Sequence, residues 1–329
     1  MNAVLPCSPL MGPRPGQLLL PPPVVAPGLS VGTLSPLSQE VRSQLVSRDS
    51  KVGLFIGHPL DKAKAAFDRS QLIHHAWTIH NDRPGAAVLE EHENQAVRDL
   101  ESSFKLFYDE RKGPVTGEIN REYLIEKIAR RCPQKYWDVQ PEFRLTAISL
   151  LNECTDDELK MLYSAVILVN FLKKEKIQVV KEARMGRFFT GPQGSRVCDS
   201  RTVSVVALHL LKIVGAAGFK VAVLGSVPSP AAHLNLALGL ASGQSIFLNN
   251  ADVFLPPDYW DRTQRSSGLI HDGALLPEWT AVGALYHGLG NYYQKRGNAK
   301  KAEAFFEAAL LIDSRFRQPG EFDIPLPDA

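Results

Sequence analysis

Residues 191–252 read GPQGSRVCDSRTVSVVALHLLKIVGAAGFKVAVLGSVPSPAAHLNLALGLASGQSIFLNNAD. The stretch predicts a helix over Cys198–Val214 that ends at a pair of glycines. A short strand over 220–224 follows, and then a hairpin of two strands joined by a turn at Ser242 and Gly243. Leucines alternate with small or polar residues over His233–Leu240, as in a half-buried strand. A helix followed by antiparallel strands predicts an α+β core.

Polar side chains in this stretch follow the order that a nucleophilic thiol needs. Cys198 stands where the helix is expected to begin, and unpaired N–H groups at a helix N-terminus favour the thiolate. His233, at the start of a strand, would form the ion pair with the thiolate and deliver its proton. A third group must orient the imidazole. Asn249, Asn250 and Asp252 at the end of the hairpin are the candidates.

The register of the hairpin decides between these three residues. If Ile246 and Leu248 share the leucine face, Asn249 lies on the face of His233 and is the first choice. A one-residue bulge would substitute Asn250, and Asp252 would serve after a bend.

Among the other residues near Cys198 in the sequence, some are expected to assist the thiol and one is excluded from the site. The Cys198 backbone N–H and the Gln193 side chain would stabilise an oxyanion, and Arg196 and Arg201 would add positive charge. His209 is excluded as the base, because at 1.5 Å per residue it lies about 16 Å along the helix from Cys198.

At these residues the chain resembles the transglutaminase-like superfamily of papain-like thiol enzymes. The resemblance covers residues 191–252 and rests on VCDSR at a helix start, AAGF at its end, the strand VAVLG, the histidine of HLNLAL and the closing IFLNNAD. It implies Cys198 as nucleophile, His233 as base and Asn249 as third member. The chain has Asn235 where the family usually has an aromatic residue, and Asn where it usually has Asp at the closing position.

The resemblance implies a thiol-dependent amide-processing enzyme, either a hydrolase or deamidase or an acyl transferase, acting on a protein or peptide. The alternative is a non-catalytic interaction protein with a degenerate transglutaminase-like core. No cofactor is expected in either case.

The flanking sequence suggests four parts. A Pro/Ser-rich leader is expected over 1–50, a helical region over 51–185, the core over 186–265 and a helical hairpin over 278–318. Periodicity predicts helices over 86–111, 121–131 and 141–152. Thr155 and Glu158 form a capping box that starts a further helix reaching Val180. We interpret the lysines and arginines near the end of this helix as a solvated C-terminal end. The alternative is a docking surface for an acidic partner.

The segment GALYHGLGNYYQKRGNAKKAEAFFEAALLIDS resembles one tetratricopeptide repeat. A lone repeat cannot bury its apolar face and must pack on the rest of the chain or on a partner. Bacterial transglutaminase-like proteins with a C-terminal tetratricopeptide segment have a similar domain order. The segment is therefore either a structural hairpin that caps the core or a surface for a protein partner.

Composition narrows the function classes further. The 329 residues carry a net charge of +2, which gives no electrostatic case for nucleic acid or an anionic membrane. No apolar run approaches the ~20 residues that span a bilayer. The four cysteines have irregular spacing without a CxxC pair, which predicts neither a zinc ribbon nor a disulfide scaffold. We expect a cytoplasmic protein, with export as an injected effector as the alternative.

A cluster of histidines, His74, His75 and His80, is the only other candidate site. Because no acidic or cysteine partner stands nearby at ligand spacing, we interpret them as ordinary histidines and expect no metal.

Overall fold

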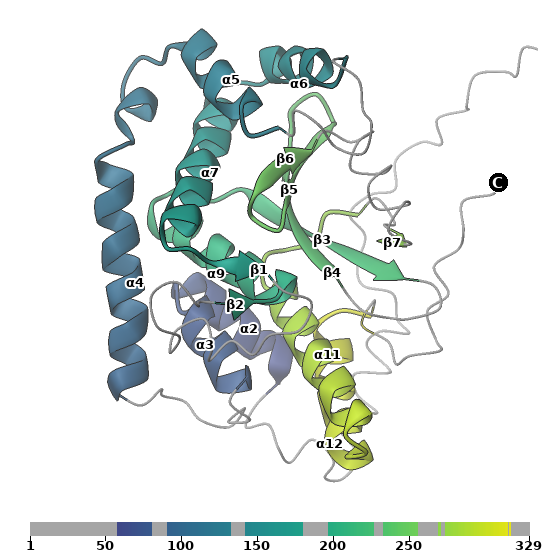
Figure 1. Ribbon diagram of the computed structural model, residues 1–329. Coiled ribbons are helices and arrows are strands. Elements are labelled where there is room, and N and C mark those ends of the chain that lie inside the picture. The colour runs from purple at the N-terminus through teal and green to yellow at the C-terminus, as the bar shows by residue number, and fades with distance from the viewer. Residues whose placement is uncertain are drawn as a thin grey trace, which may run out of the picture. The chain divides into compact units, whose positions relative to one another are not determined.

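A five-stranded sheet with helices packed against it forms the core of the computed structural model (Figure 1). The structure describes residues 58–80, 91–132, 142–179, 197–226, 233–255, 269–270, 274–314 and 316. All of them belong to one compact unit, Asp49–Ala329. The arrangement is mixed helix and sheet, as expected at that level, and the expected leader over 1–50 lies outside the described residues.

The sheet is antiparallel with the strand order β6-β5-β4-β3-β7. Its strands are β3 (Phe219–Ser226), β4 (His233–Gly239), β5 (Ser245–Asn249), β6 (Val253–Leu255) and β7 (Leu269–Ile270). The expected hairpin is β4 with β5, and the expected strand over 220–224 is the middle of β3. Neither β6 nor β7 was expected from the sequence, because each is too short to show periodicity.

The buried helix α9 (Ser200–Ile213) follows the short strand β2 (Val197–Cys198), which pairs in parallel with β1 (Gln178–Val179). The prediction that the helix begins at Cys198 is wrong by two residues. Asp199 is the N-cap, because its side chain accepts a hydrogen bond from the Thr202 amide. Cys198 therefore lies before the cap and takes no part in the first turn of the helix.

The described part of the region expected to be helical, 51–185, carries helices and, near its end, the short strand β1. Its helices are α2 (Pro59–Asp68), α3 (Leu72–His80), α4 (Glu91–Asp109), α5 (Arg121–Ala129), α6 (Glu142–Glu153) and α7 (Asp156–Lys174), with a 3-10 turn η2 at Gly113–Val115. Along α7, residues 162–169 are buried on every side, which fits a sequence that is apolar all round.

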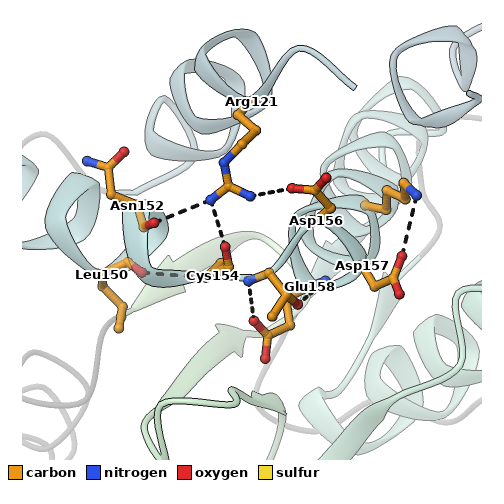
Figure 2. A network of polar contacts seen from close by, with 9 residues as sticks. Arg121, Leu150, Asn152, Cys154, Asp156, Asp157 and Glu158 are labelled. Atoms are coloured by element: carbon orange, nitrogen blue, oxygen red, sulfur yellow. Dashed lines mark hydrogen bonds and ion pairs between the residues drawn. The ribbon is translucent and has the colours of Figure 1, made fainter. Parts of the chain in front are cut away.

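The predicted capping box is present at the start of α7 (Figure 2). Thr155 Oγ1 accepts from the Glu158 amide at 3.3 Å, and a Glu158 carboxylate oxygen accepts from the Thr155 amide at 2.6 Å. Its other oxygen accepts from the amide of Ala241 at 2.5 Å, which ties α7 to the turn between β4 and β5.

The predicted end of α7 is wrong. The helix stops at Lys174 because Lys176 adopts a φ of 53°, in the left-handed region, and Gln178–Val179 then forms β1.

The C-terminal helices α11 (Thr280–Lys295) and α12 (Ala299–Ile312) form a hairpin with its turn at Gly297, where φ is 72°. α11 contacts α9, α3 and the sheet, whereas α12 contacts α2. Gly290 lets the ring of Phe306 approach α11 closely, because a Cβ there would lie 2.6 Å from the ring. The hairpin thus packs on the core of its own chain.

Candidate functional site

Cys198 ends β2 and is 0 % exposed. Burial, and after it the negative charge of Asp199, raises the pKa of its thiol to about 12. A thiol with that pKa is neutral at pH 7, and the neutral thiol is a poor nucleophile. The site as the structure has it therefore holds Cys198 in its unreactive form.

Asp199 occupies the position at which the helix could have stabilised a thiolate. One carboxylate oxygen, Oδ1, accepts from the Thr202 amide at 2.8 Å. The other accepts from Nε and Nη2 of Arg201 at 2.8 and 2.6 Å. The Asp199 side chain is 3 % exposed and that of Arg201 16 %. The positive charge expected to assist the thiol is thus bound to a neighbouring carboxylate.

The strand register places Asn249 on the sheet face of His233. Leu236 pairs with Leu248 and Leu238 pairs with Ile246, so the leucines of both strands share one face. Side chains alternate along a strand, so Asn235 and Asn249 share the opposite face, and backbone position 233 has the same parity, although the side chain of His233 lies outside the described residues. Asn249 is 7 % exposed. Ile246 and Leu248 thus share the leucine face, which is the register in which Asn249, and not Asn250, is the expected orienting residue.

The helix that follows Cys198 lies against the strand that begins with His233. α9 contacts β4, and Ser204 Oγ donates to the backbone oxygen of Leu234 at 3.3 Å as well as to that of Ser200. The helix after Cys198 is therefore packed against the hairpin.

The other two candidates differ in their contacts. The backbone N–H of Asn250 donates to Oδ1 of the buried Asn235 at 3.2 Å, whereas the side-chain Oδ1 of Asn250 is buried with no hydrogen-bond partner among the described residues. Both Asn250 and Ala251 have a φ of 50°. Asp252 forms an ion pair with Lys173 at 2.6 Å, near the end of α7. This ion pair binds the Asp252 carboxylate to Lys173, one of the lysines expected at the solvated end of α7.

Gln193 and Arg196 lie outside the described residues. His209 is held away from Cys198, because its Nε2 lies 2.7 Å from Oε1 of Glu101 on α4. His74 lies near this pair: burial lowers the pKa of His74, the charge of Glu101 raises it, and those of His209 and Arg98 lower it. Within the described ranges, no three His, Cys, Asp or Glu side chains lie close enough to hold a metal ion.

Sequence reasoning missed the role of Asp199. The signal was present, since an Asp three residues before Thr202 at the start of an apolar periodic run is a typical N-cap. It also missed Gly288 of α11, against which Arg201 packs, because such a contact has no local signature.

The fold and the site thus define a protein of mixed helix and sheet, with a cysteine before a buried helix and, beside that helix, an antiparallel hairpin that carries Asn235 and Asn249. Comparison with protein-family models, with curated proteins and with solved structures finds no match to this chain. Among the described helices, none combines the length and the apolar character needed to cross a bilayer.

Proposed function

We propose that this chain is a thiol-dependent amide-processing enzyme of the transglutaminase-like type, in which Cys198 is the nucleophile and the structure represents a resting state. The observation that supports the proposal is the hairpin register, in which strand positions 233 and 249 have the same parity, in a hairpin that the helix after Cys198 contacts. Protein or peptide amides are the proposed substrates.

In the proposed reaction Cys198 loses its proton to His233, and its thiolate attacks a carboxamide or peptide carbonyl. The carbon–nitrogen bond breaks, the nitrogen leaves with a proton from the imidazole, and a thioester remains on Cys198. Water then hydrolyses the thioester and regenerates the thiol. Asn249 would orient His233, although an amide stabilises an imidazolium less than a carboxylate does.

The test measures ammonia or amine release from a library of glutamine-containing peptides. The wild-type chain is compared with Cys198→Ala and with Cys154→Ala, a matched control because Cys154 is also buried with a thiol pKa raised to about 12. We expect release that Cys198→Ala abolishes and Cys154→Ala retains. Release that survives in Cys198→Ala contradicts the proposal.

A second function is favoured by the burial of the thiol. Cys198 is 0 % exposed and Asp199 raises its pKa further, as suits a structural cysteine in a non-catalytic interaction protein. The absence of release from the whole library in wild type, together with a lower stability of Cys198→Ala, would support this second function. The hairpin α11–α12 would then be the first surface to examine for a protein partner.

The cysteines that the structure describes, Cys132, Cys154 and Cys198, are all free. Free thiols persist in reducing compartments. A cytoplasmic location is therefore part of the proposal under either function, with export as an injected effector as the alternative.

A further inference from the structure

The turn of the C-terminal hairpin carries a group of basic side chains. Between positions 291 and 303 the charged residues are Lys295, Arg296, Lys300, Lys301 and one acidic residue, Glu303. This short segment therefore has a larger positive charge than the +2 of the whole chain. Residues 294–300 are all exposed, and Lys301 is half-buried. We call the four basic residues the basic tip.

The fold brings these charges together from two helices. Lys295 ends α11, and Lys300 and Lys301 lie in the first turn of α12, beyond Gly297. Figure 1 shows this turn at the end of the hairpin that points away from the sheet. Like charges repel, and lysines at a helix N-terminus oppose the helix dipole, which no acidic residue in the first turn of α12 offsets. Features that work against local stability are typical of functional surfaces.

Tyrosine rings hold two of these cations in place. Cζ of Arg296 lies 4.3 Å from the ring centroid of Tyr292, and Nζ of Lys301 lies 4.8 Å from that of Tyr293. The two ring centroids are 5.3 Å apart, and the Tyr293 ring stacks on Phe305 of α12 at 5.6 Å. One cation from each side of the turn is thus fixed on rings that belong to the hairpin. Side chains ordered in advance lose less conformational freedom when a partner binds.

The chemistry of the basic tip favours an acidic protein segment over other anionic partners. Proteins that bind single-stranded nucleic acid stack the bases on exposed aromatic rings, but Tyr293 is 8 % exposed and Tyr292 carries Arg296 over its ring. Attachment to an anionic membrane uses apolar side chains that insert, and the exposed large hydrophobic residues of the described ranges all lie outside 291–303. Carboxylates need neither feature, because Arg and Lys bind them through charge-assisted hydrogen bonds.

We propose that the basic tip is a docking surface for an acidic segment of another protein, one that places several Asp or Glu side chains close together. The inference goes beyond the proposed enzyme, because it uses no residue of the candidate site. One face of the hairpin then packs on the core of its own chain, and its turn receives the partner.

The test measures binding of a fluorescein-labelled octapeptide of alternating Glu and Ser to the full chain by fluorescence anisotropy, at low and at physiological salt. The same peptide with Lys in place of Glu is the control probe. We expect binding of the acidic peptide that weakens as salt is added, because salt screens exposed charges, and no binding of the basic peptide. Failure of the acidic peptide to bind at millimolar concentration overturns the proposal.

Arg296→Gln with Lys300→Gln removes two charges from the basic tip. The matched control is Lys105→Gln with Lys127→Gln, which removes two charges elsewhere and includes a lysine whose Nζ lies 5.1 Å from the ring centroid of Tyr123. We expect the dissociation constant to rise about fivefold in the first double variant and less than about twofold in the control. Equal weakening in both means that net charge alone attracts the peptide, and it overturns the proposal.

Tyr292→Leu keeps every charge but removes the ring beneath Arg296. The dissociation constant should rise about threefold, because the arginine must then be ordered by the partner. Tyr123→Leu, which removes the ring beneath Lys127, is the control and should bind the peptide as wild type does. Thermal unfolding shows whether each variant is folded. Wild-type affinity in a folded Tyr292→Leu would mean that the basic tip is an ordinary solvated charge run, contrary to the proposal.

Two further probes separate the classes of partner. An octamer of single-stranded oligo(dT) and vesicles containing phosphatidylserine are tested at physiological salt beside the acidic peptide. Tighter binding of either probe than of the peptide overturns the assignment of an acidic protein segment. None of these measurements depends on Cys198 or on amide release, so the docking surface and the proposed enzyme can fail separately.

Discussion

Oε1 of Glu101 on α4 lies 2.7 Å from Nε2 of His209 on α9, and the imidazole is 0 % exposed. Burial alone would raise the pKa of Glu101, but the hydrogen bond and the charge of His209, followed by the charges of His74 and Lys105, lower it overall. The pair therefore joins the helical region to the helix that follows Cys198, through an ionised carboxylate.

Glu101→Gln should destabilise the fold by about 2 kcal/mol at pH 7, because a buried imidazole loses a charged partner. Denaturant unfolding measures the change. Because the pKa of Glu101 is lowered in the folded protein, its stabilising contribution is fully present above the pKa of an unfolded glutamate, about 4.3. The contribution is lost as the pH falls through the folded pKa. The difference between wild type and Glu101→Gln should thus shrink in acid.

The matched control is Glu110→Gln, one residue beyond the end of α4, since Glu110 pairs with Arg111 at an exposed position. Exposed pairs contribute about 0–1 kcal/mol. If Glu110→Gln costs as much as Glu101→Gln, the buried pair is not the cause.

His75 should make the protein lose stability in mild acid. Burial, and after it the charge of Lys62, lowers the pKa of His75 to about 4, whereas an unfolded histidine has a pKa of about 6.5. As the pH falls below that value, the unfolded chain binds the proton first, so stability decreases between pH 6.5 and 4 by roughly 3 kcal/mol. Below pH 4 this residue causes no further loss.

His75→Leu removes the titrating group, and unfolding free energies measured from pH 7 to 4 should then fall less steeply than in wild type. His92→Leu, at an exposed position of α4, should leave the wild-type slope unchanged. Identical slopes for wild type and His75→Leu would show that another group is responsible.

Glu158 should matter more than an ordinary helix cap. Thr155→Ala should cost about 1 kcal/mol, the usual value for an N-cap. Glu158→Ala should cost more, because its carboxylate accepts from Thr155 and also from Ala241 in the turn of the hairpin. Thermal or denaturant unfolding checks the order of the two variants. Glu153→Ala, at the exposed end of α6, is the control and should be close to neutral.

Ala251→Gly should stabilise the protein by about 0.5–1 kcal/mol, because alanine is held there at a φ of 50° that glycine adopts without strain. Ala237→Gly is the control, since Ala237 is buried within β4 and glycine weakens a strand interior. Unfolding midpoints should move in opposite directions for the two variants. A decrease in both would mean that the methyl group of Ala251 contributes more by packing than its backbone conformation costs.

Much of the fold follows from the sequence because its signals are local. The apolar periodicity that predicts a helix over 86–111, the Thr155–Glu158 capping box and the leucine alternation after His233 each concern neighbouring residues of one helix or one strand. The face shared by positions 233 and 249 also followed, since strand parity fixes it once the leucines are paired. Short strands such as β1, β6 and β7 exist only through pairing with distant backbone and leave no such pattern.

The sequence by itself determined which residues are candidates and in what order they follow along the chain: a thiol, an imidazole and a carboxamide. Only the tertiary structure decided the state of the thiol. Cys198 is neutral because the packing around it excludes water and places Asp199 beside it, and Arg201 binds Asp199 at a place that Gly288, on a helix far along the chain, leaves open. Charge interactions and burial depend on distances in space, which no local pattern encodes.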